Sequence, residues 1–501
     1  MRTARALPLL VLALSASAAE PAKRPALSDT VREVVAFDAP SVALTHVRVV
    51  DGTGAPAKDD QTVLLEDGAI RAIGSAGSTP APQGAKVLDL AGRTVMPGLV
   101  GMHDHLFFPA GGAVYHEMAY SFPRLYLACG VTTLRTTGSI EPYTDLELKK
   151  RIDAGLAPGP RMHVTGPYLE GKGAFTAQMH ELVSAQDAKQ TVEFWADQGA
   201  TSFKTYMEIS RAELAAVIDE AHKRGLKVTG HLCSVTLGEA ADLGIDNLEH
   251  GFAAATDFLA SKKPDVCPGQ EEGQQSLAAV DVEGAAMKAL IQKLVDKKVA
   301  LTSTLTVFET FTPGRPMPPG TEVLLPELKT QFETIYNRVA AQKDSVETKL
   351  FPKMMALERA FAKAGGLLVA GTDPTGYGGV IPGYSNHRQM ELLVEAGFTP
   401  LEAIQICTSN GAKYLGRDAK IGSIAPGKQA DLTVLSLADT PFIPWEDPVT
   451  GVVLGGAPQH VVATLVSGKP RYEKGGKTWL ELIDAARSAR SRLLQSADPT
   501  S

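Results

Sequence analysis

The sequence lacks any block of lysine or arginine residues, and its formal net charge is −7. This argues against a nucleic-acid footprint and against a polybasic patch that would bind a membrane. It also lacks solenoid-type repeats, and its composition, 44% hydrophobic and 21% charged, is that of an ordinary globular protein. A small-molecule partner is therefore expected, and a homo-oligomer is left open.

Cysteine is scarce as well, with four residues in the whole chain. Cys129 and Cys407 lie in apolar, helix-like patterns, which predicts buried thiols. Cys233 and Cys267 lie in predicted loops. They are the one pair that we consider for a disulfide, and two free thiols are the alternative.

The N-terminus has the pattern of a secretory signal peptide at residues 1–19. Arg2 and Arg5 precede an apolar run over residues 6–14, and small residues follow at 15–19. The run is too short for a membrane span, and no cysteine lies beside it to carry a lipid anchor. Export to a periplasm or to the outside of the cell is expected, and an oxidising compartment permits a disulfide.

The length of 501 residues accommodates one large α/β barrel and a smaller module. Short β-patterns separated by turn residues occur at 42–50, 62–66, 69–73 and 86–90, and matching patterns recur at 431–435 and 461–466. We expect both chain ends to form one flanking β-sandwich, from residues 40–97 and 418–475. The barrel would occupy residues 98–417, and a helical tail would occupy residues 476–501.

Between residues 97 and 415 strand patterns alternate with helix patterns, which favours parallel strands joined by crossover helices. After the opening run at 95–106, strands are expected at 130–135, 161–165, 201–204, 227–231, 247–250, 300–304 and 367–373. Eight such units predict an α/β fold of the (β/α)8 TIM-barrel class, whose chemistry lies at the C-terminal strand ends.

Metal-ligand residue types end five of these predicted strands. His103 and His105 are two residues apart, so an extended strand would place both imidazoles on one face. The later strand ends add Lys204, His231, His250 and Asp373. Six ligands exceed the needs of one tetrahedral ion and suit two divalent metal ions that share a bridging group.

Lys204 is the unusual member of this set, because metal cations would repel its ammonium group. Carboxylation of the amine by CO2 would give an anionic carbamate that can bridge two metals. Histidine and carboxylate ligands suit zinc, the metal that we expect, and also manganese, iron and cobalt.

In this order on successive strands, the six residues resemble the binuclear branch of the amidohydrolase superfamily. The stretches at 221–231, 247–251, 371–373 and 421–431 are similar to those of its imidazolonepropionase-like and Xaa-Pro or Xaa-Arg dipeptidase-like members. The resemblance covers residues 40–475. It implies a barrel with a two-part β-sandwich, and hydrolysis of amide or ester bonds.

The resemblance also implies a role for each ligand. His103, His105 and Asp373 would hold the more buried metal, His231 and His250 the more exposed one, and carboxylated Lys204 would bridge them. A metal-bridging hydroxide would attack the substrate carbonyl. Asp373 would be the catalytic residue that passes the proton to the leaving amine.

The sequence departs from the relatives at two places. Mononuclear deaminases and imidazolonepropionase carry a glutamate three residues after the fifth-strand histidine, where this chain has Ser234. This favours a hydrolase of open-chain amides, such as a dipeptide or an N-acyl amino acid. A mononuclear deaminase or cyclic-amide hydrolase and a non-catalytic binding barrel are the alternatives. The second departure is Arg135-Thr136-Thr137, where related sequences often read Arg-Asp.

Substrate contacts are expected from loops that follow the strands. The candidates are Tyr168, Tyr206, His387 and Arg388. An arginine or a tyrosine could bind a substrate carboxylate.

Overall fold

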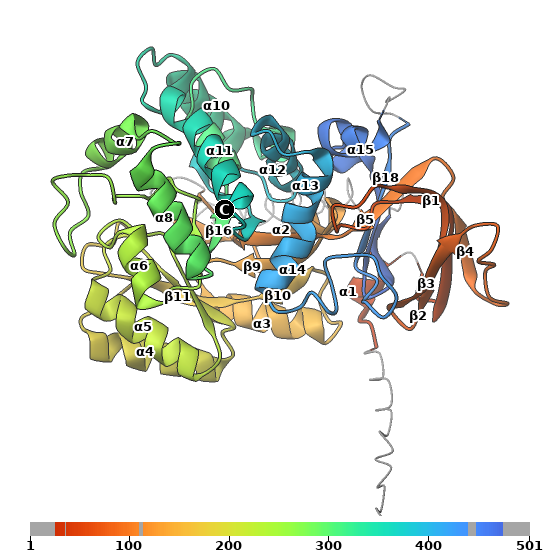
Figure 1. The fold of residues 1–501 in the computed structure, drawn as a ribbon. Helices are drawn as coiled ribbons and strands as arrows, with labels where there is room; N and C mark the ends of the chain where they lie inside the picture. The colour runs from red at the N-terminus through yellow and green to blue at the C-terminus, as the bar shows by residue number, and fades with distance from the viewer. Residues whose placement is uncertain (1–25, 36, 110–113, 439–446, 474–501) are drawn as a thin grey trace, which may run out of the picture.

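A computed structural model describes residues 26–35, 37–109, 114–438 and 447–473 (Figure 1). The predicted signal peptide and the predicted C-terminal helix lie outside these residues. Within them, no helix is both long enough and apolar enough to cross a membrane.

Strands from both chain ends form one eight-stranded sheet, seen on the right in Figure 1. Its order is β20-β19-β18-β5-β1-β2-β3, and β4 pairs with β1. The bounds are β1 Ser41–Val49, β2 Lys58–Glu66, β3 Ala69–Ser75, β4 Lys86–Asp89, β5 Arg93–Pro97, β18 Leu432–Ser436, β19 Val461–Val466 and β20 Lys469–Glu473. The sheet has its own apolar core, which includes Val42, Leu44, Val63 and Leu432.

Two hairpin turns of this sheet have the left-handed backbone that their sequences favour. Asp67 and Gly68 have φ of 49° and 85°, and Ser467 and Gly468 have φ of 50° and 71°. Two successive residues with positive φ fit the right-handed twist of the flanking strands. A Cβ on Gly68 would lie 2.4 Å from the Ser467 carbonyl oxygen, so the two turns touch.

The central part of the chain consists of parallel strands and helices, which confirms the α/β prediction. The strands are β6 Leu99–Asp104, β9 Val131–Thr136, β10 Arg161–His163, β11 Thr165–Glu170, β13 Ser202–Thr205, β14 Lys227–Gly230, β15 Asn247–Glu249, β16 Ala300–Ser303 and β17 Leu368–Ala370. The main helices are α2 Ser121–Ala128, α3 Pro142–Asp153, α4 Ala185–Gln198, α5 Arg211–Lys223, α6 Leu237–Leu243, α7 Gln270–Ala279, α8 Ala285–Asp296, α9 Leu305–Glu309, α10 Pro326–Ala340, α11 Glu347–Lys363, α12 Tyr384–Glu395 and α13 Pro400–Gln405. Between α13 and α14 Gly411–Tyr414 the chain forms a π-helical segment, Ile406–Asn410.

These strands form two ladders, β10-β9-β6 and β12-β11-β13-β14-β15-β16-β17, in which β12 is His180–Glu181. Two links connect the ladders. Ser139, after β9, bridges Pro167 in β11. The backbone N–H groups of Thr372 and Asp373 donate to the His103 carbonyl oxygen at 2.9 and 2.8 Å. The last strand therefore ends beside the first.

A disulfide joins Cys233 to Cys267, with their Cα atoms 4.9 Å apart, and this confirms the predicted pair. Cys129 and Cys407 are buried free thiols, as expected. Lys262, in the loop that the disulfide holds, also donates to the Ser234 carbonyl oxygen at 2.6 Å. The disulfide therefore ties the loop after β15 to the residues that follow β14.

Replacing both Cys233 and Cys267 by alanine should lower the free energy of unfolding. The disulfide closes a loop with a sequence separation of 34 residues, and the chain-entropy model gives about 3–4 kcal/mol for that length. Urea unfolding of the double variant and of the oxidised parent measures the difference. Alkylation of both cysteines in the unreduced parent protein would show that the bridge does not form.

Candidate metal centre

The six predicted ligands lie at or just beyond the C-terminal ends of parallel strands. His103 is the next-to-last residue of β6 and His105 follows the strand, Lys204 is in β13, and His231, His250 and Asp373 follow β14, β15 and β17. His103, His105 and Lys204 are buried, and each residue is at most 1% exposed.

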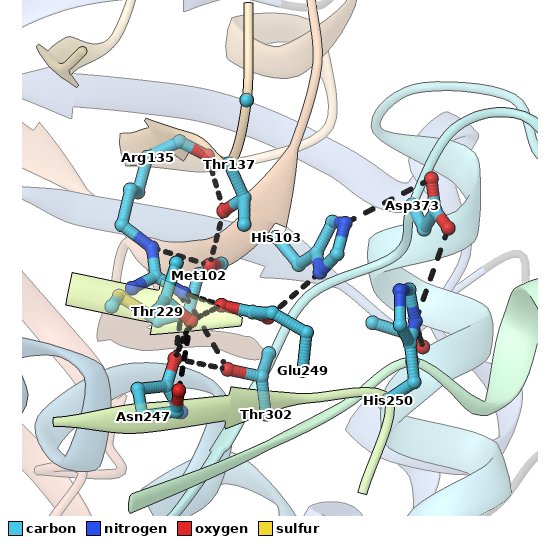
Figure 2. A network of polar contacts seen from close by, with 12 residues as sticks. Met102, His103, Arg135, Thr137, Thr229, Asn247, Glu249, His250, Thr302 and Asp373 are labelled. Carbon is cyan, nitrogen blue, oxygen red and sulfur yellow. Dashed lines mark hydrogen bonds and ion pairs between the residues drawn. The ribbon is translucent and has the colours of Figure 1, made fainter. Parts of the chain in front are cut away.

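Asp373 lies among the histidines, as Figure 2 shows for His103 and His250. Its Oδ1 is 3.3 Å from His105 Nε2 and 3.9 Å from His103 Nε2, and its Oδ2 is 3.9 Å from His250 Nδ1. Ligand atoms of His103, His105 and Asp373 all lie within 4.8 Å of one another, a spacing that one metal ion could span. The three residues predicted to hold the more buried metal ion therefore lie close together.

The remaining histidines adjoin this group. The ring centroid of His250 is 4.6 Å from that of His103 and 4.4 Å from that of His231. Burial lowers the pKa values of His231 and His250, and the charge of the Lys204 amine acts on both in the same direction. The six predicted residues therefore form one continuous cluster.

Two of the six residues have a positive φ, a backbone conformation that residues other than glycine rarely adopt. His250 has φ of 65° and Asp373 has φ of 50°. Left-handed non-glycine residues cost free energy and concentrate at functional sites. Next to Asp373, a Cβ on Gly371 would lie 2.2 Å from the His103 backbone nitrogen. The close approach of the last and first strands therefore needs a glycine there.

Hydrogen bonds at Nδ1 fix the orientation of three rings. His103 Nδ1 lies 2.7 Å from Glu249 Oε2, and His105 Nδ1 lies 3.2 Å from the Gly138 carbonyl oxygen. Carboxylate and carbonyl oxygens only accept, so Nδ1 carries the proton and Nε2 keeps its lone pair. His250 Nδ1 lies 2.8 Å from Thr304 Oγ1. Such partners orient metal-binding histidines.

The Glu249 carboxylate belongs to a buried ion pair that the sequence reasoning missed (Figure 2). Arg135 Nη2 donates to Glu249 Oε1 at 2.6 Å, and Thr229 Oγ1 donates to the same oxygen. Arg135 also donates from Nε to the Met102 carbonyl oxygen at 2.8 Å, in the residue before His103. Arg135 and Glu249 are 1% and 0% exposed. The pair therefore positions His103 from two sides.

Replacing Glu249 by glutamine should lower the free energy of unfolding of the metal-free protein by about 3–5 kcal/mol, because the buried Arg135 charge loses its partner. The double variant Arg135→Met, Glu249→Leu removes both charges and should lose less than the single variant. Urea unfolding measures both. A single variant that stays within about 1 kcal/mol of the parent would contradict the ion-pair role.

Burial sets the protonation of the cluster. It lowers the pKa of Lys204 to about 8, with Arg135 acting in the same direction and Glu249 and Asp373 opposing it. Burial, together with Lys204, lowers the pKa of His231 to about 3. Burial would raise the pKa of Asp373, but His103 and His105 hold it below its usual value. Neutral imidazoles and an ionised carboxylate are the forms that bind metals.

Asp104 lies between His103 and His105. Its side chain points to the opposite face of the strand, because successive side chains of a strand alternate between its two faces. Its Oδ1 accepts from Thr372 Oγ1 at 2.7 Å, and burial raises its pKa to about 6. Asp104 therefore ties the first strand to the residue before Asp373.

Two of the predicted substrate contacts reach the cluster. Tyr168 Oη lies 3.4 Å from His105 Nε2, and the side chain is buried. The Tyr206 ring packs edge-on against His231, with centroids 4.8 Å apart.

The other two predicted contacts make structural interactions. His387 is buried, and its Nε2 donates to the Cys129 carbonyl oxygen at 2.8 Å. Arg388 pairs with Glu309 at 2.7 Å and also with Glu391. Both residues lie on α12 rather than on the loop before it, and none of their described contacts reaches the histidines.

The geometry of the cluster agrees with the similarity of the chain to known proteins. The family model described as "Amidohydrolase family" matches residues 94–471. An enamidase of Eubacterium barkeri is 22% identical over 436 residues, covering 84% of this chain and 92% of the relative. An imidazolonepropionase of Salinispora tropica is 25% identical over 422 residues, covering 80% and 92%.

A solved structure of a Xaa-Pro dipeptidase with bound methionine in the active site has the same fold, with a TM-score of 0.62 at 18% identity, and covers 86% of this chain and 100% of its own. Such neighbours imply a TIM barrel with an additional domain. The chain belongs to the amidohydrolase family and is a metal-dependent hydrolase that acts on carbon–nitrogen bonds.

Proposed function

We propose that this protein is an exported, binuclear metal-dependent hydrolase that cleaves an open-chain amide such as a dipeptide or an N-acyl amino acid. The observation that carries the proposal is the position of Lys204. Its amine is fully buried beside the histidines and has no hydrogen-bond partner among the described residues. A buried polar group without a partner is costly, which argues that a bound group satisfies it.

The residues fit two divalent metal ions, for which zinc is the expected identity. His103, His105 and Asp373 would hold one ion, and His231 and His250 would hold the other. His231 Nδ1 is also buried without a partner in the described part of the chain. Lys204 would bridge the two ions as a carbamate, and burial, which lowers its pKa to about 8, increases the fraction of neutral amine that can react with CO2.

Bound divalent ions lower the pKa of water and polarise a carbonyl oxygen. The chain supplies the remaining functions. Asp373 is positioned to take a proton at a carboxylate oxygen and pass it to the leaving nitrogen. Glu249 would keep the His103 ring in one orientation.

We also propose that the two parallel ladders are parts of one closed (β/α)8 barrel. The hydrogen bonds from Thr372 and Asp373 to His103 and the bridge from Ser139 to Pro167 support closure. The flanking sheet would then be the separate β-domain of residues 40–97 and 418–475.

Export rests on the signal-peptide pattern of residues 1–19, and the disulfide is compatible with an oxidising compartment. The N-terminal mass of the protein secreted by its natural host tests this. A chain that retains residue 1 and stays in the cytoplasm would contradict it.

The substrate class is tested by assaying zinc-loaded protein against dipeptides, N-acyl amino acids and cyclic amides. Hydrolysis of open-chain amides, abolished by a chelator and restored by metal, is expected. Preferential opening or deamination of a ring would favour the cyclic-amide alternative, for which the imidazolonepropionase relative is the supporting observation.

A further inference from the structure

A series of aromatic rings lines one side of the candidate metal centre. The Phe107 ring stacks on His105 with centroids 4.3 Å apart, and Tyr115 lies 5.0 Å beyond Phe107. Phe175 is 6.4 Å from Tyr115 and 5.9 Å from Tyr206. These spacings are those of neighbouring aromatic groups in contact. We call Phe107, Tyr115, Phe175 and Tyr206 the first aromatic arm.

The first aromatic arm returns to the metal centre at its far end. Tyr206 lies 4.8 Å from His231, which lies 4.4 Å from His250. Because His250 is 4.6 Å from His103 and His103 is 5.1 Å from His105, the rings make a closed circuit. The proposed metal ligands and the first aromatic arm therefore form one ring of neighbouring side chains.

A second aromatic arm extends from His250. Phe308 lies 5.8 Å from His250, Phe311 lies 6.2 Å from Phe308, and Tyr377 lies 5.1 Å from Phe311. These three residues follow β16 and β17, whereas the first aromatic arm follows the earlier strands. The two arms thus leave the histidines from different strand ends.

Both arms reach solvent. Phe175 is 59% exposed and Tyr377 is 54% exposed, although large apolar side chains are usually covered. Exposed aromatic groups around a polar centre are typical of a ligand-binding site.

Tyr377 is held in this position by a strained turn. Its φ is 56°, and the flanking Gly376 and Gly378 have φ of 49° and 88°. A Cβ on Gly376 would lie 2.7 Å from Val380 Cγ2 and 2.8 Å from Thr310 Oγ1, so the turn is tightly packed. A bulky left-handed residue four positions after Asp373 indicates a functional constraint on the tyrosine.

The arginines closest in sequence to the second arm are already neutralised. Arg315 pairs with Glu309 at 2.8 Å and with Glu395 at 2.6 Å. Arg388 pairs with Glu309 at 2.7 Å. Neither guanidinium is therefore available as the bidentate partner of a substrate carboxylate.

From these contacts we infer that the site takes amides that carry an aromatic or large apolar group, bound between the two arms, and that a free substrate carboxylate adds little. This inference rests on the proposed function and specifies its substrate class. Apolar contacts of this kind act on binding more than on the chemical step, so they should appear mainly in KM.

The first test compares N-acetylphenylalanine with N-acetylalanine, each as the free acid and as the carboxamide, on zinc-loaded protein. The phenylalanine compounds should have kcat/KM at least ~10-fold higher, and the carboxamides should be cleaved no more slowly than the acids. Tyr377→Ala and Phe175→Ala should raise KM for the phenylalanine compounds several-fold and leave kcat unchanged. Tyr143→Ala, at a tyrosine that is 58% exposed on α3, is the matched control and should change neither.

The second test measures binding without turnover. Hydroxamates chelate divalent metals, so benzohydroxamate and acetohydroxamate differ chiefly in the aromatic group offered to the arms. Calorimetry on zinc-loaded protein should show tighter binding of benzohydroxamate, and Tyr377→Ala should remove that difference. Equal affinities, with no effect of Tyr377→Ala or Phe175→Ala, would overturn the inference. Preferential benzohydroxamate binding without cleavage of any amide would uphold the inference and refute the proposed function.

Discussion

Replacement of Lys204 by alanine is expected to remove bound metal and hydrolytic activity together. The amine is buried beside the histidines and has no hydrogen-bond partner in the described structure, and its removal would leave the proposed bridge without a replacement. Loss of an outer-shell partner lowers metal affinity roughly 10–100-fold, and loss of a direct ligand should cost more. Metal content by elemental analysis and kcat should be measured on the same samples.

Lys227→Ala is the matched control, because Lys227 begins β14 at the opposite strand end and donates to the Tyr414 carbonyl oxygen. It should keep its metal. Partial recovery of Lys204→Ala with acetate or propionate would support a carbamate. A Lys204→Ala protein with two metals and full activity would exclude the bridge.

The second large effect is expected from Asp373→Asn. Asparagine keeps the shape of the side chain but cannot take up a proton, and general acid–base groups contribute on the order of 10²–10⁴-fold to rate. We therefore expect kcat to fall by about that factor, with a smaller loss of metal. Single-turnover kinetics on metal-saturated protein measures the chemical step.

Asp246→Asn provides the comparison for this variant. Asp246 precedes β15, at the end of the strand away from the histidines, and accepts from the Val228 backbone N–H at 2.8 Å. Its substitution should leave kcat unchanged. Near-normal turnover of Asp373→Asn would mean that another group carries the proton.

The sequence predicted the residues whose positions follow from a strand pattern alone. His103 and His105 end an apolar run and are two residues apart, so alternation places both on one face. His250 could be assigned as a strand-end residue because Asn247–Glu249 forms a short strand before it. Because the strands are parallel, their C-terminal ends lie on the same side of the sheet, and these residues, which are distant in the sequence, come together there.

Residues defined by a distant partner could not be assigned in this way. Glu249 is adjacent to His250, but its function depends on Arg135, 114 positions earlier, and on Thr229. The signal that was available is a charged residue inside a predicted strand of a parallel sheet, because such strands are buried and a buried charge requires a partner. In Arg135-Thr136-Thr137, the arginine that related sequences share is the partner of Glu249, and nothing in the described structure explains the threonine that follows it.

The predicted substrate contacts show the same limit. Tyr168 and Tyr206 lie in or just after strands, and both contact the histidines. His387 and Arg388 lie on α12. Which side chains of this helix point toward the histidines depends on how the helix packs, and a periodic pattern in the sequence does not show that. Tyr377 and Phe175, in contrast, belong to loops whose conformation the sequence could not specify.

The central claim is that the cluster binds two metal ions and that both are needed for hydrolysis. The direct measurement is a titration of metal-free protein with zinc, following bound metal per chain and amide hydrolysis in the same samples. Activity should rise with occupancy and reach its plateau at two ions per chain. Full activity at one ion per chain, with no second ion bound, would contradict it.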